Sequence, residues 1–334
     1  MKFQISTPAR IHLSLIDLNG SLDRVDGGLG ICVNNPQLKI EFSDETSDLF
    51  VFSGPQQHKN YFEEFAIKFY EKFNIVPKPI AVKIQKFVAE HQGLGSKTQF
   101  LLTIAKGMCM LYETEMTPHQ MAVLIGRGGT SGIGYQTFFN GGFVFDLGHS
   151  FGKGKDKQSF LPSSASASPP ALPFYLNKCP TNWRILLIQL NVKQGANKEE
   201  EINIFQKYTP LKLSDVEKIS HRILMQFLPG FIENNISLMA QSLHFINNHG
   251  FKKVEISLQN SLVSILIEKI YQKFSVPVGM SSFGPTIFTI CDSNSLMISI
   301  KSYVQNVLEN ELNSPECAFI ETKPNNKGHK IEFL

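Results

Sequence analysis

The sequence lacks an apolar run approaching the ~20 residues that a membrane span requires, and its start, MKFQISTPARIHLSL, contains none long enough for a signal peptide. Charged residues make up only 18% of the chain, and the formal net charge is +3. Lysines and arginines are dispersed, so no nucleic-acid surface is indicated. The slight basic excess suits an anionic small substrate, and it is equally typical of an ordinary protein surface. We therefore expect a cytoplasmic protein that binds neither membranes nor nucleic acid.

Cysteine is also scarce. The five cysteines are an odd number, lie far apart and include no CxxC pair, which argues against a disulfide framework and a zinc site. None has a nearby His or Asn pattern typical of a catalytic thiol, so we expect reduced and mostly buried cysteines. They are Cys32, Cys109, Cys179, Cys291 and Cys317.

The apolar content, 42% of 334 residues, is sufficient for one large domain or two ordinary ones. A polar stretch at 153–173, KGKDKQSFLPSSASASPPALP, is rich in Ser, Ala and Pro and cannot pack a core. We interpret it as a linker or as a long loop beside an active site. The expected domains are therefore 1–173 and 174–334.

Periodicity and turn residues predict alternating strands and helices. The strongest helix start is at Thr117, which is expected to be the N-cap, with Pro118 at the first helical position. An exposed tail is expected to follow the last strand. Strands are predicted at 38–42, 49–52, 80–87, 183–190 and 318–321, and helices at 61–73, 101–112, 117–125, 213–227, 231–248, 257–273 and 295–309.

The dipeptide Asn19-Gly20 between two alternating runs predicts a β-hairpin. A two-residue turn would place Asp17 opposite Leu22, on the same apolar face as Arg24. Charges on such a face are costly unless they are paired or used. Two interpretations stay open: a salt bridge beside the turn, or an acid and a cation that project into a pocket.

A second feature is GLGSKTQF at 93–100, which precedes a helical stretch but does not have Walker A spacing. Glycines allow backbone N–H groups to approach an anion, and a helix N-terminus adds its dipole. The alternative is a plain helix N-cap. The expected phosphate-binding residues are Gly93, Leu94, Gly95, Ser96, Thr98 and Gln99.

Two further glycine-containing segments follow. Residues 126–146 hold many glycines around Arg127, Ser131 and Asp146, which indicates backbone packed against a ligand or a neighbouring strand. His149 is interpreted as an acid/base or as a solvated loop residue. The turn at 281–286 would close over the site or simply join two elements. Because no Rossmann fingerprint is present, these segments together indicate a phosphate-handling site of a less common type.

The segments TPARIHLSLIDLNGSLDRVDGGLGI, GLGSKTQF, GRGGTSGIG, FFNGGFVFDLGHSF, FLPSSASASPP and GMSSFGPTIF together resemble the β-ribofuranosylaminobenzene 5′-phosphate synthase family, a branch of the GHMP kinase superfamily. The resemblance covers nearly the whole chain. It implies a two-domain α+β fold: an N-terminal GHMP-type phosphate-binding domain with a left-handed βαβ crossover, and a ferredoxin-like C-terminal domain. The site would lie in the cleft between them.

The resemblance also implies a reaction. Phosphoribosyl pyrophosphate would condense with 4-aminobenzoate or 4-hydroxybenzoate, releasing pyrophosphate and carbon dioxide, on the way to a tetrahydromethanopterin-type cofactor. Mg²⁺ is expected and no organic cofactor; a homodimer is one assembly that the sequence allows. Asp17 would stabilise the cationic sugar or hold the metal, and Arg24 would bind the substrate carboxylate or phosphates. The expected substrate-binding residues are Arg10, His12, Asp26, Arg127, Ser131, Gly132, His149, Ser282 and Thr286.

The chain departs from the family pattern in its glycine loop, where Ala89 and Lys97 stand in place of proline and glycine. A side chain at residue 97 needs negative φ or a penalty of roughly 1 kcal/mol. Lys97 would add a phosphate contact or fill space that the substrate uses. Two alternatives therefore stay open: an ATP-dependent small-molecule kinase of the same superfamily, and a non-catalytic descendant that binds a phosphorylated metabolite.

Overall fold

The computed structural model describes residues 1–192, 198–312 and 317–334. A long antiparallel hairpin of β1 (Lys2–Asp17) and β2 (Arg24–Ser43) forms the centre of an eight-stranded sheet. Five strands follow the order β12-β1-β2-β4-β3; β5 and β6 also pair with β2, and β7 pairs with β5. The other bounds are β3 (Phe50–Ser53), β4 (Ile80–Lys86), β5 (Phe143–Asp146), β6 (His149–Ser150), β7 (Pro173–Asn177) and β12 (Lys330–Phe333).

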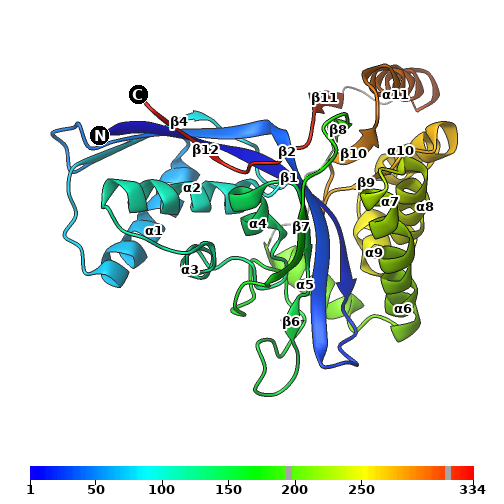
Figure 1. Cartoon of the computed structure of the whole chain (residues 1–334), viewed down its shortest axis with the longest axis horizontal. Coiled ribbons are helices and arrows are strands. Elements are labelled where there is room, and N and C mark those ends of the chain that lie inside the picture. Colours follow the sequence, from blue (N-terminus) through cyan, green and yellow to red (C-terminus); the bar gives the residue numbers. More distant parts are fainter. Residues whose placement is uncertain (193–197, 313–316) are drawn as a thin grey trace.

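Four helices pack beneath one end of this sheet (Figure 1). They are α1 (Gln56–Phe73), α2 (Ser96–Leu111), α3 (Pro118–Leu124) and α4 (Ile133–Asn140). Helix α2 is apolar on most of its surface and is buried between the sheet and the neighbouring helices. At Gly107 it approaches the Phe42 ring so closely that a Cβ there would lie 2.4 Å from the ring. The predicted cap is confirmed, because Thr117 and Gln120 form a capping box at the start of α3.

A second, four-stranded antiparallel sheet has the order β11-β8-β10-β9. In chain order, one strand and several helices are followed by two strands, a helix and a strand, which is the ferredoxin-like arrangement. The strands are β8 (Arg184–Leu190), β9 (Val278–Met280), β10 (Ile287–Cys291) and β11 (Cys317–Thr322). The helices are α5 (Lys198–Tyr208), α6 (Leu213–Arg222), α7 (Leu228–Ile232), α8 (Ile236–Asn247), α9 (Gly250–Ser257), α10 (Ser261–Phe274) and α11 (Asn294–Asn306), with π-helical turns at Ile223–Phe227 and Val307–Glu311.

Strand β8 has a continuous apolar run because both of its faces are buried. Ile185 and Leu187 enter one core cluster, while Leu186, Ile188 and Leu190 enter another on the opposite face. A strand that is buried on both faces carries apolar residues at successive positions rather than in alternation. The first cluster also contains apolar residues of β1 and β2, so the distal half of the long hairpin packs directly against the C-terminal part.

The larger sheet contains strands from both sides of the division expected at residues 173 and 174, since β7 and β12 belong to it. The expected exposed tail is not free, although Phe333 and Leu334 are exposed: β12 pairs with β1 from Phe3↔Phe333 to Ser6↔Lys330. The N–H of Leu334 donates to the carbonyl of Lys2 at 3.0 Å, which places the two termini side by side (Figure 1).

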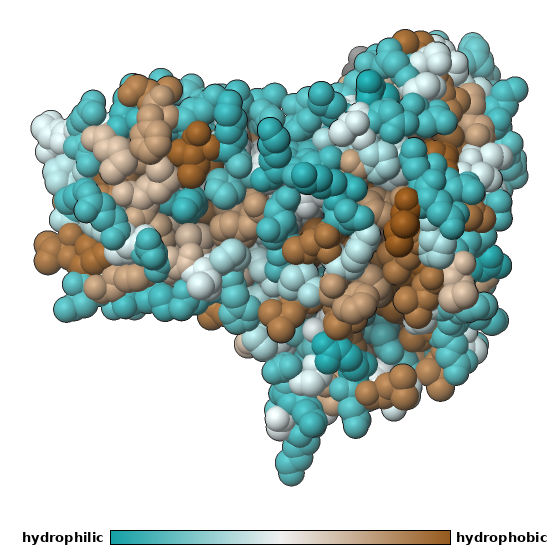
Figure 2. All heavy atoms as spheres, in the orientation of Figure 1, coloured by the Kyte–Doolittle hydropathy of each residue, from teal (hydrophilic) through white to brown (hydrophobic). Residues whose placement is uncertain are grey.

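The Ser- and Pro-rich stretch at 153–173, interpreted as a linker or as a long loop beside an active site, folds over the glycine-rich block, and its Ser164 lines both cavities described below. The carbonyl of Gly128 accepts a hydrogen bond from the N–H of Ala171 at 3.1 Å. Figure 2 shows apolar side chains on the face where Figure 1 places β7, and Leu172, Phe174 and Leu176 there are exposed. In the described part of the chain, no helix combines the length and apolar character that a membrane crossing requires.

Candidate active site

A cavity of about 640 Å³ lies between the two parts of the protein and is called the larger cavity below. The N-terminal part contributes Arg10 of β1, the glycine loop before α2 and Arg127, which follows α3. The C-terminal part contributes Glu201 of α5 and the turn that contains Ser282. The glycine loop, the turn at 281–286 and the residues after α3 therefore meet around one space.

The glycine loop has a backbone that requires glycine at two positions. Gly93 and Gly95 have φ of 74° and 77°, in the left-handed region. A Cβ at Gly93 would lie 2.1 Å from the carbonyl oxygen of Ser281. The carbonyl oxygen of Gly93 accepts hydrogen bonds from Arg10 Nη1 at 2.5 Å and Ser281 Oγ at 2.6 Å. The loop is thus fixed to both parts of the protein.

Helix α2 begins directly after Gly95, and no side chain caps it. Ser96, Lys97 and Thr98 of its first turn line the larger cavity, so the uncapped N–H groups and the helix dipole favour an anion there. Gly93, Leu94 and Gly95 also line this cavity. Gln99 does not line it; its side chain turns inward and donates to the carbonyl of Gly134 at 2.8 Å.

Lys97 does not carry the backbone strain that a positive φ would have imposed. The residue is helical, and it is not among the described residues with positive φ. Its Nζ lies 3.8 Å from the centre of the Tyr61 ring, a favourable cation–π contact. Lys97 therefore adds a cation to the cavity wall at no backbone cost.

Two guanidinium groups project into the cavity from the N-terminal part. Burial lowers the pKa of Arg10 to about 10, and burial also lowers the pKa of Arg127. Within the described residues, neither group has a carboxylate within ion-pair distance, and the Arg10 side chain donates to the Gly93 carbonyl instead. Partly buried cations without a carboxylate within ion-pair distance are suited to an anionic ligand.

A smaller cavity of about 150 Å³ adjoins the larger one and is called the smaller cavity below. The two spaces communicate, because seven residues line both: Arg10, Thr98, Arg127, Ser164, Glu201, Ser282 and Phe283. The rest of the smaller cavity's wall includes apolar or aromatic side chains from Leu15, Tyr135 and Phe205.

His12 and Ser131 are two of the polar residues that line the smaller cavity. His12 Nε2 lies 3.1 Å from Ser131 Oγ. Burial holds the pKa of His12 well below its usual range, with Arg10 and Lys252 acting in the same direction, so the ring is neutral. The pair can therefore donate or accept a hydrogen bond but does not add a charge.

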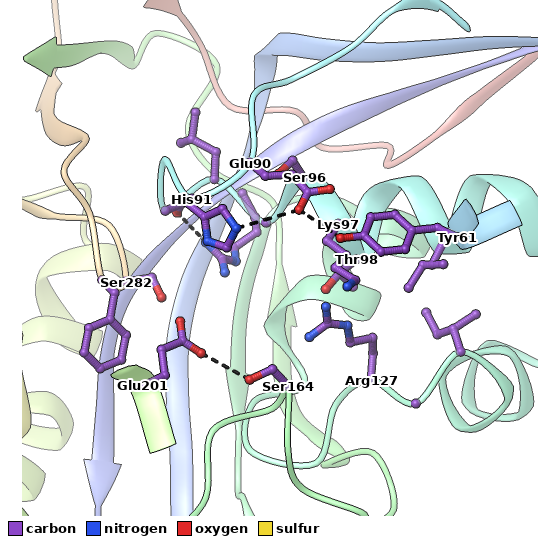
Figure 3. A pocket seen from close by; sticks show the side chains of 18 of the residues that line it. Tyr61, Glu90, His91, Ser96, Lys97, Thr98, Arg127, Ser164, Glu201 and Ser282 are labelled. Atoms are coloured by element: carbon purple, nitrogen blue, oxygen red, sulfur yellow. Dashed lines mark hydrogen bonds and ion pairs between the residues drawn. The ribbon is translucent and has the colours of Figure 1, made fainter. Parts of the chain in front are cut away.

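Glu201 is a site residue that the motifs missed. Its Oε2 accepts a hydrogen bond from Ser164 Oγ at 3.3 Å, and Ser164 belongs to the Ser- and Pro-rich loop. Burial raises the pKa of Glu201 to about 7, against the opposing effects of Ser164 and Arg127. Figure 3 shows Glu201 and Arg127 projecting toward the same space from different elements. The one available signal was the acidic start of an amphipathic stretch, KEEEINIF.

Asp26 and His149, two of the expected substrate-binding residues, form a buried cluster with Lys157 instead. His149 Nδ1 lies 2.6 Å from Asp26 Oδ2, and Lys157 Nζ donates to both Asp26 oxygens at 2.9 and 3.0 Å. Lys157 also donates to the carbonyls of Gly129 and Leu161 at 3.1 Å. None of these three side chains lines either cavity, and the cluster fixes the Ser- and Pro-rich loop in place.

Asp17 and Arg24, the expected catalytic pair, also lie outside both cavities. The expected pairing is wrong, because Asp17 faces Asp26 rather than Leu22. Asp17 Oδ1 accepts from the N–H groups of Asn19 and Gly20 at 2.7 and 3.1 Å. Arg24 is exposed and its Nε donates to the Leu147 carbonyl at 2.7 Å. In the described residues the two do not form the alternative salt bridge either.

Two other expected substrate contacts are structural in this arrangement. The Gly132 N–H donates to Asp146 Oδ2 at 2.9 Å, and burial raises the pKa of Asp146 to about 7. Thr286 is fully buried and lies 3.4 Å from Gln189 Nε2, outside both cavities. Substrate binding by Gly132 and Thr286 stays a prediction, and neither residue lines a cavity.

The wall of the larger cavity is compatible with Mg²⁺ that arrives with a phosphorylated substrate. Mg²⁺ usually binds through one or two carboxylates plus substrate phosphates. Glu90 lines the larger cavity, and its Oε1 is a buried oxygen without a hydrogen-bond partner. The described residues contain no group of three or more His, Cys, Asp or Glu that could hold a metal alone. Glu90 is therefore the candidate protein ligand.

The fold is that of known small-molecule kinases. The structure of homoserine kinase from Cytophaga hutchinsonii superimposes with a TM-score of 0.68 at 16% identity, covering 99% of this chain and 97% of that one. Phosphomevalonate kinase from Streptococcus pneumoniae also gives a TM-score of 0.68, at 9% identity, covering 97% and 100%. At these identities the likeness shows a two-domain GHMP-kinase-like fold and nothing about activity.

Sequence comparison identifies much nearer relatives. A protein of Methanocaldococcus jannaschii, named β-ribofuranosylphenol 5′-phosphate synthase, is 38% identical over 98% of this chain and 99% of its own length. A protein of the same name from Archaeoglobus fulgidus is also 38% identical, with the same coverage. No model of a known protein family matches the chain. Identity at this level over whole chains shows that the protein belongs to the β-ribofuranosylphenol 5′-phosphate synthase family.

Proposed function

We propose that this protein condenses phosphoribosyl pyrophosphate with 4-hydroxybenzoate or 4-aminobenzoate, forming a carbon–carbon bond to ribose and releasing pyrophosphate and carbon dioxide. The observation that carries the proposal is the pair of communicating cavities: the larger has cations and a helix N-terminus in its wall, and the smaller combines aromatic and aliphatic side chains with polar groups. Arg10, Arg127, Lys97 and the N-terminus of α2 surround the larger cavity and suit a pyrophosphate. The names of the relatives describe a phenol that carries a ribosyl 5′-phosphate, and this agrees with a phenolic acceptor.

The smaller cavity suits the arene. Leu15, Phe205 and Phe283 provide apolar walls for a ring, and the neutral His12 and Ser131 can hydrogen-bond a hydroxyl or amino group. Arg127 lines both cavities, so its guanidinium can hold the arene carboxylate or a phosphate oxygen. We place phosphoribosyl pyrophosphate in the larger cavity and the arene in the smaller one.

This arrangement provides what the chemistry requires. The bond between ribose C1 and the pyrophosphate oxygen breaks with its electron pair on oxygen, and the developing charge meets Arg10, Arg127 and the α2 N–H groups. When bound through Glu90 and the substrate phosphates, Mg²⁺ would supply further charge neutralisation. The ring carbon that carries the carboxylate then bonds to C1, and carbon dioxide leaves from that carbon. No strong general base is needed, because carbon dioxide departs in place of a proton.

A substrate comparison tests the proposal. The purified protein with Mg²⁺ and phosphoribosyl pyrophosphate is expected to release pyrophosphate when 4-hydroxybenzoate or 4-aminobenzoate is present, and not with benzoic acids that lack a 4-substituent donor. Absence of pyrophosphate release with both arenes would refute it. Formation of ADP from ATP and a small alcohol would instead support the kinase, and tight pyrophosphate binding without turnover would support a non-catalytic descendant.

A further inference from the structure

The proposed reaction creates positive charge where the two cavities meet. As the bond from C1 to the pyrophosphate oxygen breaks, its electrons leave with pyrophosphate, and C1 and the ribose ring oxygen share the positive charge. With pyrophosphate in the larger cavity and the arene in the smaller one, C1 lies at their junction. The guanidinium groups there stabilise the leaving group but repel the sugar cation, so a carboxylate is needed beside it.

Glu201 is the carboxylate at that junction. Among the described residues it alone of the acidic side chains lines both cavities; Glu64 and Glu90 line the larger cavity, and Glu255 lines the smaller one. Glu255 is neutralised by a buried ion pair with Lys252. Glu90 Oε2 accepts hydrogen bonds from Gln57 Nε2 and the Tyr61 hydroxyl, and Glu90 does not line the smaller cavity.

We propose that Glu201 is a catalytic residue that stabilises the cationic ribose during carbon–carbon bond formation; this inference rests on the proposed function. The hydrogen bond that Glu201 accepts from Ser164 engages Oε2, so Oε1 can face the sugar. Figure 3 shows the carboxylate beside Ser164, with Arg127 extending from the N-terminal part. One of the two roles that the family resemblance implied for Asp17, stabilising the cationic sugar, is thus proposed for a residue that reaches the cavity.

The step balances without a covalent bond to the protein. The arene carbon that carries the carboxylate gives a π electron pair to C1, which discharges the ribose cation. The electron pair of the bond to the carboxylate then returns to the ring as carbon dioxide leaves. The ionised form of Glu201 contributes its negative charge while the cation exists and is unchanged afterwards, so no proton or electron passes through it.

The test uses Glu201→Gln, which keeps the shape and the acceptor for Ser164, with Glu201→Asp as a second variant. Glu217→Gln, an exposed position on α6, is the matched control. For Glu201→Gln we expect kcat to fall about 100-fold or more, the scale of losing one transition-state electrostatic contact. The Kd for pyrophosphate, measured by calorimetry, should stay within about threefold or improve, because a negative charge has left an anion site. Glu201→Asp keeps the charge and should lose about tenfold or less.

Each outcome bears on the inference. A wild-type kcat in Glu201→Gln would overturn the role of Glu201 while leaving the proposed function intact. Equal losses in the Gln and Asp variants, or a parallel loss of pyrophosphate binding and thermal stability, would assign Glu201 a structural role and also overturn it. If the wild-type protein released no pyrophosphate with either arene, the proposed function and this inference would fail together.

Discussion

Gly93 joins the glycine loop to both parts of the protein, so Gly93→Ala is the substitution whose effect is most fully determined by the structure. The new Cβ would lie 2.1 Å from the carbonyl oxygen of Ser281, well inside any normal contact. It would also place a side chain at φ 74°. Gly126 is the matched control, since it lines the same cavity with φ 63° and has no atom within 4 Å of the position that a Cβ would occupy.

The two variants are expected to lose different amounts of stability, because both introduce a left-handed alanine but only Gly93→Ala also introduces a steric clash. Left-handed backbone costs an alanine about 1–2 kcal/mol at either position. Forcing atoms into occupied space adds about 1–3 kcal/mol, and this applies to Gly93 alone. We therefore expect the free energy of unfolding to fall by about 2–5 kcal/mol for Gly93→Ala and by about 1–2 kcal/mol for Gly126→Ala.

Urea unfolding of both variants measures these losses, and calorimetry with pyrophosphate measures the consequence for the site. Gly93→Ala should also weaken pyrophosphate binding, because the shift of the loop displaces the carbonyl that Arg10 and Ser281 hold. Equal losses of stability in the two variants would refute the claim that the glycine loop and the turn at 281–286 are packed against each other.

Three other predictions concern separate features. Thr117→Ala should lower the free energy of unfolding by about 1 kcal/mol in urea, because it removes the capping box with Gln120. Lys97→Met should lower the free energy of unfolding by no more than about 1 kcal/mol, the scale of the lost cation–π contact with Tyr61. Calorimetry should show weaker pyrophosphate binding that depends less on salt; unchanged binding would contradict an anion-facing role. Asp146 has a folded pKa of about 7 against an ordinary 3.8, so the native state keeps its proton longer than the unfolded state. Stability from this group is therefore lost as pH rises from about 4 to about 7, by about 4 kcal/mol in total, and unfolding of Asp146→Asn across this range should lack that slope.

The fold was largely predictable because its signals are local. The cap at Thr117, the apolar run of β8 and the glycine loop before α2 each depend on a few neighbouring residues, and all three are present. The pairing of the tail was missed because the short strand β12 has no pattern of its own and is formed by pairing with β1.

The site was less predictable because it depends on register and on long-range packing. The face assigned to Asp17 and Arg24 assumed a two-residue turn, whereas β1 ends at Asp17 and β2 begins at Arg24. Register shifts between Thr7 and Ala9 and between His12 and Ser14 also interrupt simple alternation along β1. Glu201 carries no motif, and only the folding of α5 against the loop of Ser164 brings it to the cavity.

The central claim is that pyrophosphate departure and decarboxylation occur in one condensation. The most direct measurement follows pyrophosphate and labelled carbon dioxide together, using phosphoribosyl pyrophosphate and 4-hydroxybenzoate or 4-aminobenzoate labelled in the carboxylate. We expect both products to appear in equal amounts and at the same rate. Pyrophosphate without labelled carbon dioxide, which would indicate simple hydrolysis, or the absence of both products would contradict the claim.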